Sequence, residues 1–316
     1  MVDQSIIDRY IEESTVNMMS LSKRKAKNVI TSFLLLKPDV KFSDLTRDDL
    51  IEMFSMLALI SQNSFHNRKS EIKDFAKWMN ENGYATDEII YNISSIQYSD
   101  IDRTPYFDKY YFKDLTDLYD AMEEVFSERG SEFDTFRVSA ILVWCGLEVK
   151  EICEILKSDF NEDKMEIICS QSGKKVRFSD EIEHIGRFII DYKDSDSYDS
   201  RKLGGRTLKY MNSKYLLRSY KSAHYTVPLL SNLAITANRV AKEREDGKLF
   251  QLNRISLSGL YYRMYQYENG NGVIDKIDLK TLQSFFHVGG TLTSQKKLEL
   301  TRKYNEYREF RDYFYL

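Results

Sequence analysis

Histidine, cysteine and proline are scarce in this chain of 316 residues, which has 4, 3 and 3 of them respectively. A zinc site or a disulfide framework needs such residues at paired spacings, and these are few and far apart. The cysteines are odd in number and lie in apolar surroundings, so we expect buried thiols. No metal site and no cofactor are expected. The residues concerned are Cys145, Cys153, Cys169, His66, His184, His224 and His287.

Long hydrophobic runs are missing as well. No stretch approaches the roughly 20 apolar residues that cross a membrane. The first residues, Met-Val-Asp-Gln-Ser, lack the basic-then-apolar pattern of a secretory signal. We therefore expect a cytoplasmic protein without a membrane partner. With only 3 prolines and 13 glycines, the chain is also not a low-complexity protein.

The length and the charge are the next constraints. A chain of 316 residues is predicted to form two domains, each large enough to bury its own core. Its formal net charge of -3 argues weakly against a nucleic-acid partner. A net charge averages over all faces, however, and contact with a phosphate backbone needs only one basic face. The positions of the charges therefore matter more than their sum.

Residues 1–98 show the apolar periodicity of a four-helix domain. A helix capped by Ser20 or Ser22 carries cations in its first turns, and a helix capped by Ser64 carries more on its polar side. Phosphate contact and a solvated helix face are both compatible with this pattern. We predict DNA contact. The cations are Lys23, Arg24, Lys25, Lys27, Arg68, Lys69 and Lys73.

A second domain is predicted at residues 109–316, after a linker at 99–108 in which Pro105 breaks the helical pattern. Apolar residues at helical spacing predict a helix over 112–128 and another that includes 136–144. The chain is therefore expected to be mainly α, with strands confined to the second domain.

Two short strands, at 165–169 and 176–178, are predicted to form a hairpin with a Gly-containing turn between them. Basic residues in the turn and on the second strand can bind phosphate. They are Lys174, Lys175 and Arg177.

A strong local charge signal follows the hairpin. Residues 191–200 are acidic and are expected to form a flexible loop, whereas residues 201–221 contain seven cations, interleaved tyrosines and no Asp or Glu. Cations with aromatic residues suit a nucleic-acid backbone. The alternative is a surface loop that solvates the acidic stretch beside it, and we favour DNA contact. The cations are Arg201, Lys202, Arg206, Lys209, Lys214, Arg218 and Lys221.

A further helix is predicted from Asn253, capped by Ser256 or Ser258. Its first turns hold two arginines and two tyrosines that could reach phosphates or base edges. Alternatively the tyrosines pack inward. We expect one of the two rings to be buried and the other to be exposed. The residues predicted to contact DNA are Arg254, Tyr261, Tyr262 and Arg263.

The pattern from Gly146 to Asp159 resembles a segment of the tyrosine recombinases, or phage integrases, which have Gly-Leu-Arg-x-x-Glu-Leu followed by Leu and Asp. The part from Ile277 to Tyr304 resembles the C-terminal box of that family, His-x-Leu-Arg and then a nucleophilic tyrosine. The matching residues are Gly146, Leu147, Glu151, Ile152, Leu156, Asp159 and either Tyr304 or Tyr307. The resemblance implies an N-terminal four-helix core-binding (SAM-like) domain and an α+β catalytic-like domain with a small antiparallel sheet.

Three positions depart from that family's pattern. Glu148 stands where the first arginine is expected, Ile277 where the histidine is, and Lys280 where the second arginine is. At contact distance and an effective dielectric of about 20, a carboxylate repels a phosphate by about 4 kcal/mol. An isoleucine cannot donate a hydrogen bond, and a lysine cannot grip two oxygens with a planar fork. The family's hairpin lysine falls on Ser172 or Lys174.

These departures predict a non-catalytic member of the fold, with Tyr304 as a vestige. The whole chain resembles the family of master repressors (MrpR) that maintain lysogeny in SPbeta-like phages. That resemblance implies repression of lytic genes in a bacterial host cell. Expected partners are a double-stranded DNA operator and an antirepressor or inducer protein. An active or residual recombinase using Tyr304 is the alternative. Lys280 is also expected to contact DNA.

Overall fold

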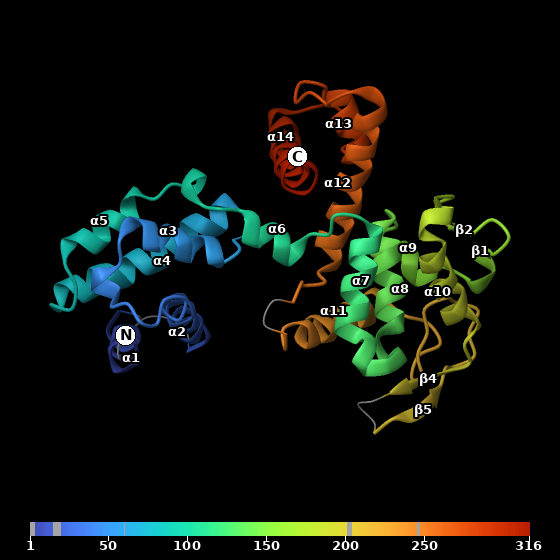
Figure 1. Ribbon diagram of the computed structural model, residues 1–316, viewed down its shortest axis with the longest axis horizontal. Helices are drawn as coiled ribbons and strands as arrows, with labels where there is room; N and C mark the ends of the chain where they lie inside the picture. The colour runs from blue at the N-terminus through green and yellow to red at the C-terminus, as the bar shows by residue number, and fades with distance from the viewer. Residues whose placement is uncertain (1–3, 15–19, 60, 201–203, 245–246) are drawn as a thin grey trace. The chain divides into compact units, whose positions relative to one another are not determined.

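The computed structural model describes residues 4–14, 20–59, 61–200, 204–244 and 247–316. The chain divides into two compact units, Met1–Asp108 and Lys109–Leu316, here called the N-terminal and C-terminal units (Figure 1). Each unit has its own cluster of buried apolar side chains. Among the described residues, no helix has both the length and the apolar character needed to span a membrane.

The N-terminal unit is helical, as predicted, but its described residues form five α-helices where four were expected. Aromatic rings fill its centre: Phe54 lies 4.9 Å from Phe33 and 5.5 Å from Phe65 between ring centroids. All three side chains are fully buried. Its helices are α1 (Gln4–Ser14), α2 (Ser20–Leu34), α3 (Arg47–Met56), α4 (Gln62–Glu81) and α5 (Asp87–Ser95), with short 3-10 turns at η1 (Phe42–Asp44) and η2 (Tyr98–Asp100).

A capping box fixes the start of α3. The Thr46 side chain accepts a hydrogen bond from the Asp49 amide, and the Asp49 carboxylate accepts one from the Thr46 amide. Lys37 Nζ lies 2.5 Å from the same carboxylate. Together these donors lower the pKa of Asp49 from 3.8 to about 2. On α4 the predicted cap was wrong: Ser61 caps the helix and accepts from the amide of Ser64, which lies in the first turn.

Pro105 does not break a helix, contrary to prediction. It is the second residue of α6 (Thr104–Tyr110). A proline is accommodated in the first turn because the amide that it lacks would have no partner inside the helix.

The C-terminal unit is also mainly helical, with two small antiparallel sheets. Its first sheet has the order β1-β2-β3, and Ile167 pairs with Val176 across the predicted hairpin, which is confirmed. The elements up to this sheet are α7 (Leu115–Phe126), η3 (Ser127–Phe133), α8 (Asp134–Trp144), α9 (Val149–Glu154), η4 (Lys157–Asp159), β1 (Phe160–Asn161), β2 (Glu166–Ile168) and β3 (Lys175–Arg177).

The region expected to be an acidic loop is ordered instead. Residues 191–194 end a helix, and Ser197–Ser200 form β4, which pairs with β5 in a second hairpin. The remaining elements are η5 (Asp180–Ile182), α10 (Glu183–Asp194), β5 (Arg206–Lys209), α11 (Val227–Ala241), α12 (Leu252–Asn271), α13 (Leu279–Phe285) and α14 (Ser294–Tyr315). The predicted thiols are free: Cys153 and Cys169 are buried, and Cys145 is half-buried.

Helix α12 packs against the C-terminal end of α8 at very short range. A Cβ atom built on Gly259 would lie 1.9 Å from the carbonyl oxygen of Trp144. From the same helix, Arg263 Nη1 donates to that oxygen at 2.7 Å. Ser258, which was predicted to cap α12, lies inside it and is buried; its hydroxyl accepts from the Phe112 amide at 3.2 Å.

Replacing Gly259 with alanine should destabilise the C-terminal unit by about 3 kcal/mol, because the added methyl group forces α12 away from α8. The midpoint of urea unfolding measures the change. Gly270→Ala on the same helix is the matched control, since a Cβ there meets no atom within 4 Å. Alanine should be neutral or stabilise that site by up to about 1 kcal/mol. Equal midpoints for the two variants would contradict a tight crossing.

The stability of the N-terminal unit should depend on pH through Asp49. Because folding lowers its pKa, the ionised carboxylate stabilises the fold above 3.8, and this contribution is lost as the pH falls to about 2. Asp49→Asn should therefore lower the unfolding temperature at neutral pH and have little effect at about pH 2. Asp48→Asn, an exposed position in the same helical turn, is the control in calorimetry. An effect of Asp49→Asn that is the same at both pH values would contradict this assignment.

Candidate nucleic-acid interface

In the N-terminal unit, α2 and α4 form a groove with basic walls. Its volume is about 670 Å³. Arg24 and Lys25 come from α2 and Arg68 from α4, and no carboxylate is among the described residues that line it. We call it the α2–α4 groove. Its lining residues are Arg24, Lys25, Asn28, Val29, Ser32, Leu57 and Arg68.

A second hollow, of about 420 Å³, adjoins this groove and shares Lys25 and Arg68 with it. It has acidic residues on one side, and Glu71 pairs with Arg68 at 2.8 Å. No described acidic group pairs with Arg24 or Lys25. The positive charge of the groove is therefore strongest along α2.

The groove also contains residues that sequence reasoning missed. Asn28 and Ser32 follow Arg24 at intervals of four residues, which places them on the same face of α2. Asn67, beside Arg68 on α4, lines the adjoining hollow. Amide side chains can bond base edges as well as phosphates. The four-residue spacing was the signal that could have revealed them.

Two other predicted cations of this unit, Lys69 and Lys27, are bound within the protein. Lys69 Nζ donates to the carbonyl oxygens of Ser94 at 2.8 Å and Ile96 at 2.6 Å, and burial lowers its pKa. Lys69 is therefore a tie to the end of α5, and its prediction as a DNA contact is corrected. Lys27 forms an ion pair with Asp8. Lys23 and Lys73 are half-buried on α2 and α4.

In the C-terminal unit, exposed cations lie on β3, on β5 and in the segment after β5. None of them forms an ion pair with a described acidic group. Arg201 and Lys202 lie outside the described residues. The exposed cations are Lys175, Arg177, Arg206, Lys209, Lys214 and Lys221.

Arg218, which was predicted to contact DNA, is only 1% exposed. Its guanidinium donates to backbone carbonyls, so the prediction was wrong. Tyr261 is fully buried and stacks at 6.0 Å on Tyr111, which corrects a second prediction. Tyr262 is half-buried beside Trp144, so the predicted buried ring is confirmed but the predicted exposed ring is not found.

The two arginines predicted at the start of α12 serve the fold. Arg254 pairs with Glu306 of α14 at 2.9 Å and donates to the Tyr111 hydroxyl. Arg263 donates to the Trp144 carbonyl, and burial lowers its pKa. Both predictions as DNA contacts are corrected, because these guanidinium groups join helices.

The positions predicted to match a recombinase centre are those of Glu148, Ile277 and Lys280. Glu148 is exposed at the N-cap of α9, and its amide donates to Glu151 at 2.7 Å. Lys174 of the hairpin pairs with the same Glu151 at 2.9 Å. Ile277 is 75% exposed, and Lys280 is exposed in the first turn of α13. Among the described residues, no three His, Cys, Asp or Glu side chains come together as metal ligands.

The candidate nucleophile, Tyr304, is buried on α14. Its side chain is 5% exposed, and its hydroxyl donates to the carbonyl oxygen of Ile274 at 2.7 Å. Burial raises the pKa of Tyr304, which opposes the formation of a phenolate. Tyr307, the alternative, is fully buried. In this arrangement Tyr304 supports the turn between α12 and α13.

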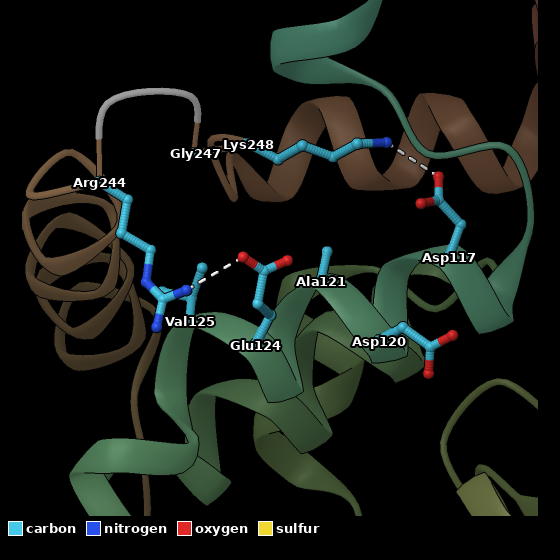
Figure 2. Close-up of a pocket in the computed structure, with 8 residues that line it drawn as sticks. All are labelled: Asp117, Asp120, Ala121, Glu124, Val125, Arg244, Gly247 and Lys248. Atoms are coloured by element: carbon cyan, nitrogen blue, oxygen red, sulfur yellow. Dashed lines mark hydrogen bonds and ion pairs between the residues drawn. The ribbon is translucent and has the colours of Figure 1, made fainter.

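A hollow of about 540 Å³ lies between α7 and the residues that precede α12. Figure 2 shows Lys248 reaching Asp117, and Arg244 reaching Glu124, across this hollow. The two ion pairs measure 2.9 Å and 3.0 Å. Asp120 adds a third carboxylate, so acidic groups outnumber basic ones. This charge does not favour nucleic acid, and the ion pairs fix α7 to the chain after α11.

No family model and no curated protein matches the sequence. A search of solved structures finds recombinases across nearly the whole chain. A lambda integrase dimer bound to a COC′ core site is 14% identical, covers 95% of this chain and 95% of its own, and has a TM-score of 0.32. XerA recombinase is 15% identical, with 96% and 98% covered and a TM-score of 0.37. Lambda integrase bound to DNA is 15% identical, with 97% and 99% covered and a TM-score of 0.33. These are loose superpositions, and the inferences below rest on this chain's own residues.

Tyr304→Phe should lower the stability of the C-terminal unit by about 1 kcal/mol, because the Ile274 carbonyl loses its donor in a buried place. Urea unfolding measures the loss. Tyr267→Phe, which alters an exposed hydroxyl on α12, is the matched control and should change little. If Tyr304→Phe were as stable as the unaltered protein, the hydrogen bond to Ile274 would have no structural role.

Proposed function

We propose that the protein binds double-stranded DNA without cutting it, on a scaffold of the integrase type. The α2–α4 groove is the observation that carries this proposal. Arg24, Lys25 and Arg68 converge there from two helices, with amide and hydroxyl groups between them and no carboxylate in the lining. Phosphate oxygens and base edges are the ligands that such a set fits.

The C-terminal unit supplies a second group of exposed cations, on β3 and on β5 with the segment after it. Each phosphate neutralised by such a side chain releases condensed counterions, which drives binding at low salt. The net charge of -3 is compatible with this, because a net charge averages over all faces of the protein and DNA contact needs only one basic face.

The chemistry around Tyr304 supports binding over strand cleavage. A phosphotyrosyl transfer needs an accessible nucleophile and cations that stabilise the growing charge on the phosphate. Tyr304 is buried and hydrogen-bonded, and Glu148 and Ile277 offer no cation or imidazole. Loss of a single such donor can cost about 100-fold in rate or more.

A protein that grips duplex DNA and leaves it intact acts as a repressor or an architectural factor. We favour a repressor that binds a specific operator and keeps prophage genes silent, in the cytoplasm of a bacterial host. The amide groups of Asn28 and Asn67 beside the cations support sequence reading. An antirepressor or inducer protein would be the partner that releases the operator.

The salt dependence of binding tests the proposal. The double variant Arg24→Ala, Lys25→Ala should weaken binding to a labelled duplex of mixed sequence and flatten the slope of log K against log salt by about 2. The variant Lys41→Ala, Lys77→Ala removes the same charge from other exposed sites of the N-terminal unit and should leave the slope unchanged. Equal slopes for the two variants would remove the groove from the interface.

Selection of bound duplexes from a random library then supplies the operator, and denaturing electrophoresis of that complex shows whether a covalent adduct forms. We expect a gel shift without adduct. An adduct that disappears in Tyr304→Phe would establish a recombinase instead. The absence of any shift would leave a protein-only interaction module.

A further inference from the structure

The buried guanidinium of Arg218 lies at the base of the β4–β5 hairpin, where β4 begins and β5 ends. Nη2 donates to the carbonyl oxygens of Tyr192 at 3.2 Å, Lys193 at 2.9 Å and Ser195 at 2.6 Å. Tyr192 and Lys193 lie in the last turn of α10 and Ser195 directly follows the helix, two residues before β4 begins. The carbonyls of a last helical turn have no partner inside the helix, and a cation there is favoured by the helix dipole.

The other end of the hairpin meets the same group. Tyr210 directly follows β5, and its ring lies 4.6 Å from the guanidinium carbon of Arg218. Its amide donates to the Asp196 carbonyl at 2.9 Å, which closes the hairpin. Tyr192 completes the surroundings, since its hydroxyl accepts from the Arg218 amide at 3.2 Å. One side chain therefore contacts the segment that leads into β4 and the residue that follows β5.

The hairpin carries two of the exposed cations of the C-terminal unit. Arg206 and Lys209 are both on β5, where they pair across the sheet with Ser200 and Ser197. With two strands of four residues each, such a hairpin is only marginally stable by itself. Its orientation must come from the residues at its base and from its packing against η3.

We infer that Arg218 is a positioning residue, which holds the β4–β5 hairpin so that Arg206 and Lys209 reach the DNA backbone. This inference rests on the proposed DNA binding. Arg218 itself touches no DNA, since it is 1% exposed. A lysine would keep the charge but lacks the planar fork that serves several carbonyls and stacks on an aromatic ring. Charge and geometry can therefore be separated by one substitution.

The test compares salt slopes for three variants on the same duplex of mixed sequence. Arg206→Ala, Lys209→Ala should flatten the slope by about 2. Arg218→Lys, which loses no charge, should flatten it by a similar amount, and the triple variant should flatten it no further. Additive effects, or an unchanged slope for Arg218→Lys, would overturn the inference.

Arg137→Met is the matched control for loss of a buried arginine in the same unit. Arg137 is 6% exposed and pairs with the carboxylates of Glu123 and Asp134, rather than with the carbonyl groups at the hairpin base. The Arg137→Met variant should lower the stability of the C-terminal unit and leave the salt slope of DNA binding unchanged. If Arg137→Met flattened the slope as Arg218→Lys does, general destabilisation would be the cause and the inference would fail.

Hydrogen exchange without DNA separates this inference from the proposed function. Arg218→Lys should speed amide exchange in residues 195–200 and 204–211, with little change in α8. Unchanged exchange there would overturn the positioning role whatever binds the protein. Suppose that hydrogen exchange changed as expected but that neither the unaltered protein nor any variant bound DNA. The proposed function would then fail, and Arg218 would position the hairpin for another ligand. If the unaltered protein bound DNA but the double variant Arg206→Ala, Lys209→Ala kept the same salt slope, the hairpin would not contact DNA. The inference about Arg218 would then fail while the proposed DNA binding stood.

Discussion

The crossing of α12 over the end of α8 is the contact on which the C-terminal unit depends. Helix α8 is buried along its whole length, so its last carbonyl groups cannot be satisfied by water. The lack of a side chain at Gly259 lets α12 approach, and Arg263 then supplies a donor to the Trp144 carbonyl. Gly146 turns the chain away with a φ of 100°, a conformation that favours glycine.

Burial of arginine at helix ends recurs in this unit. Arg263 serves the end of α8, and Arg218 serves the end of α10. In both cases the charge is stabilised by carbonyl groups, and in the second also by aromatic rings. Part of the positive charge that looks available in the sequence is thereby used inside the fold. Among the cations predicted to contact DNA in this unit, those that remain exposed lie on β3, on β5, in the segment after β5 and, as Lys280, on α13.

The N-terminal unit distributes its cations in a similar way. Lys69 holds the end of α5 and Lys27 pairs with α1, while Arg24 and Lys25 stay free of described acidic partners beside Arg68. Some cations of a basic run in the sequence thus bond to other parts of the fold, and others remain exposed on a candidate binding surface. Which residue takes which role follows from the helix face on which it lies, because neighbours in sequence point about 100° apart around a helix.

The sequence alone determined the mainly helical character, the hairpin at 165–178, the burial of Cys153 and Cys169 and the helical N-terminal unit, because apolar periodicity and turn residues act locally. It also indicated where basic residues gather. It could not show that Arg218, Tyr261, Arg254 and Arg263 point inward, since that depends on which distant carbonyl groups and rings the fold brings to them. Nor could it show the β4–β5 hairpin, because the acidic stretch at 191–200 looks like a solvated loop, although Tyr198 within β4 is only 9% exposed. Long-range packing decided these positions, because a buried polar group goes where its partners are, and those partners are separated from it in sequence by tens of residues.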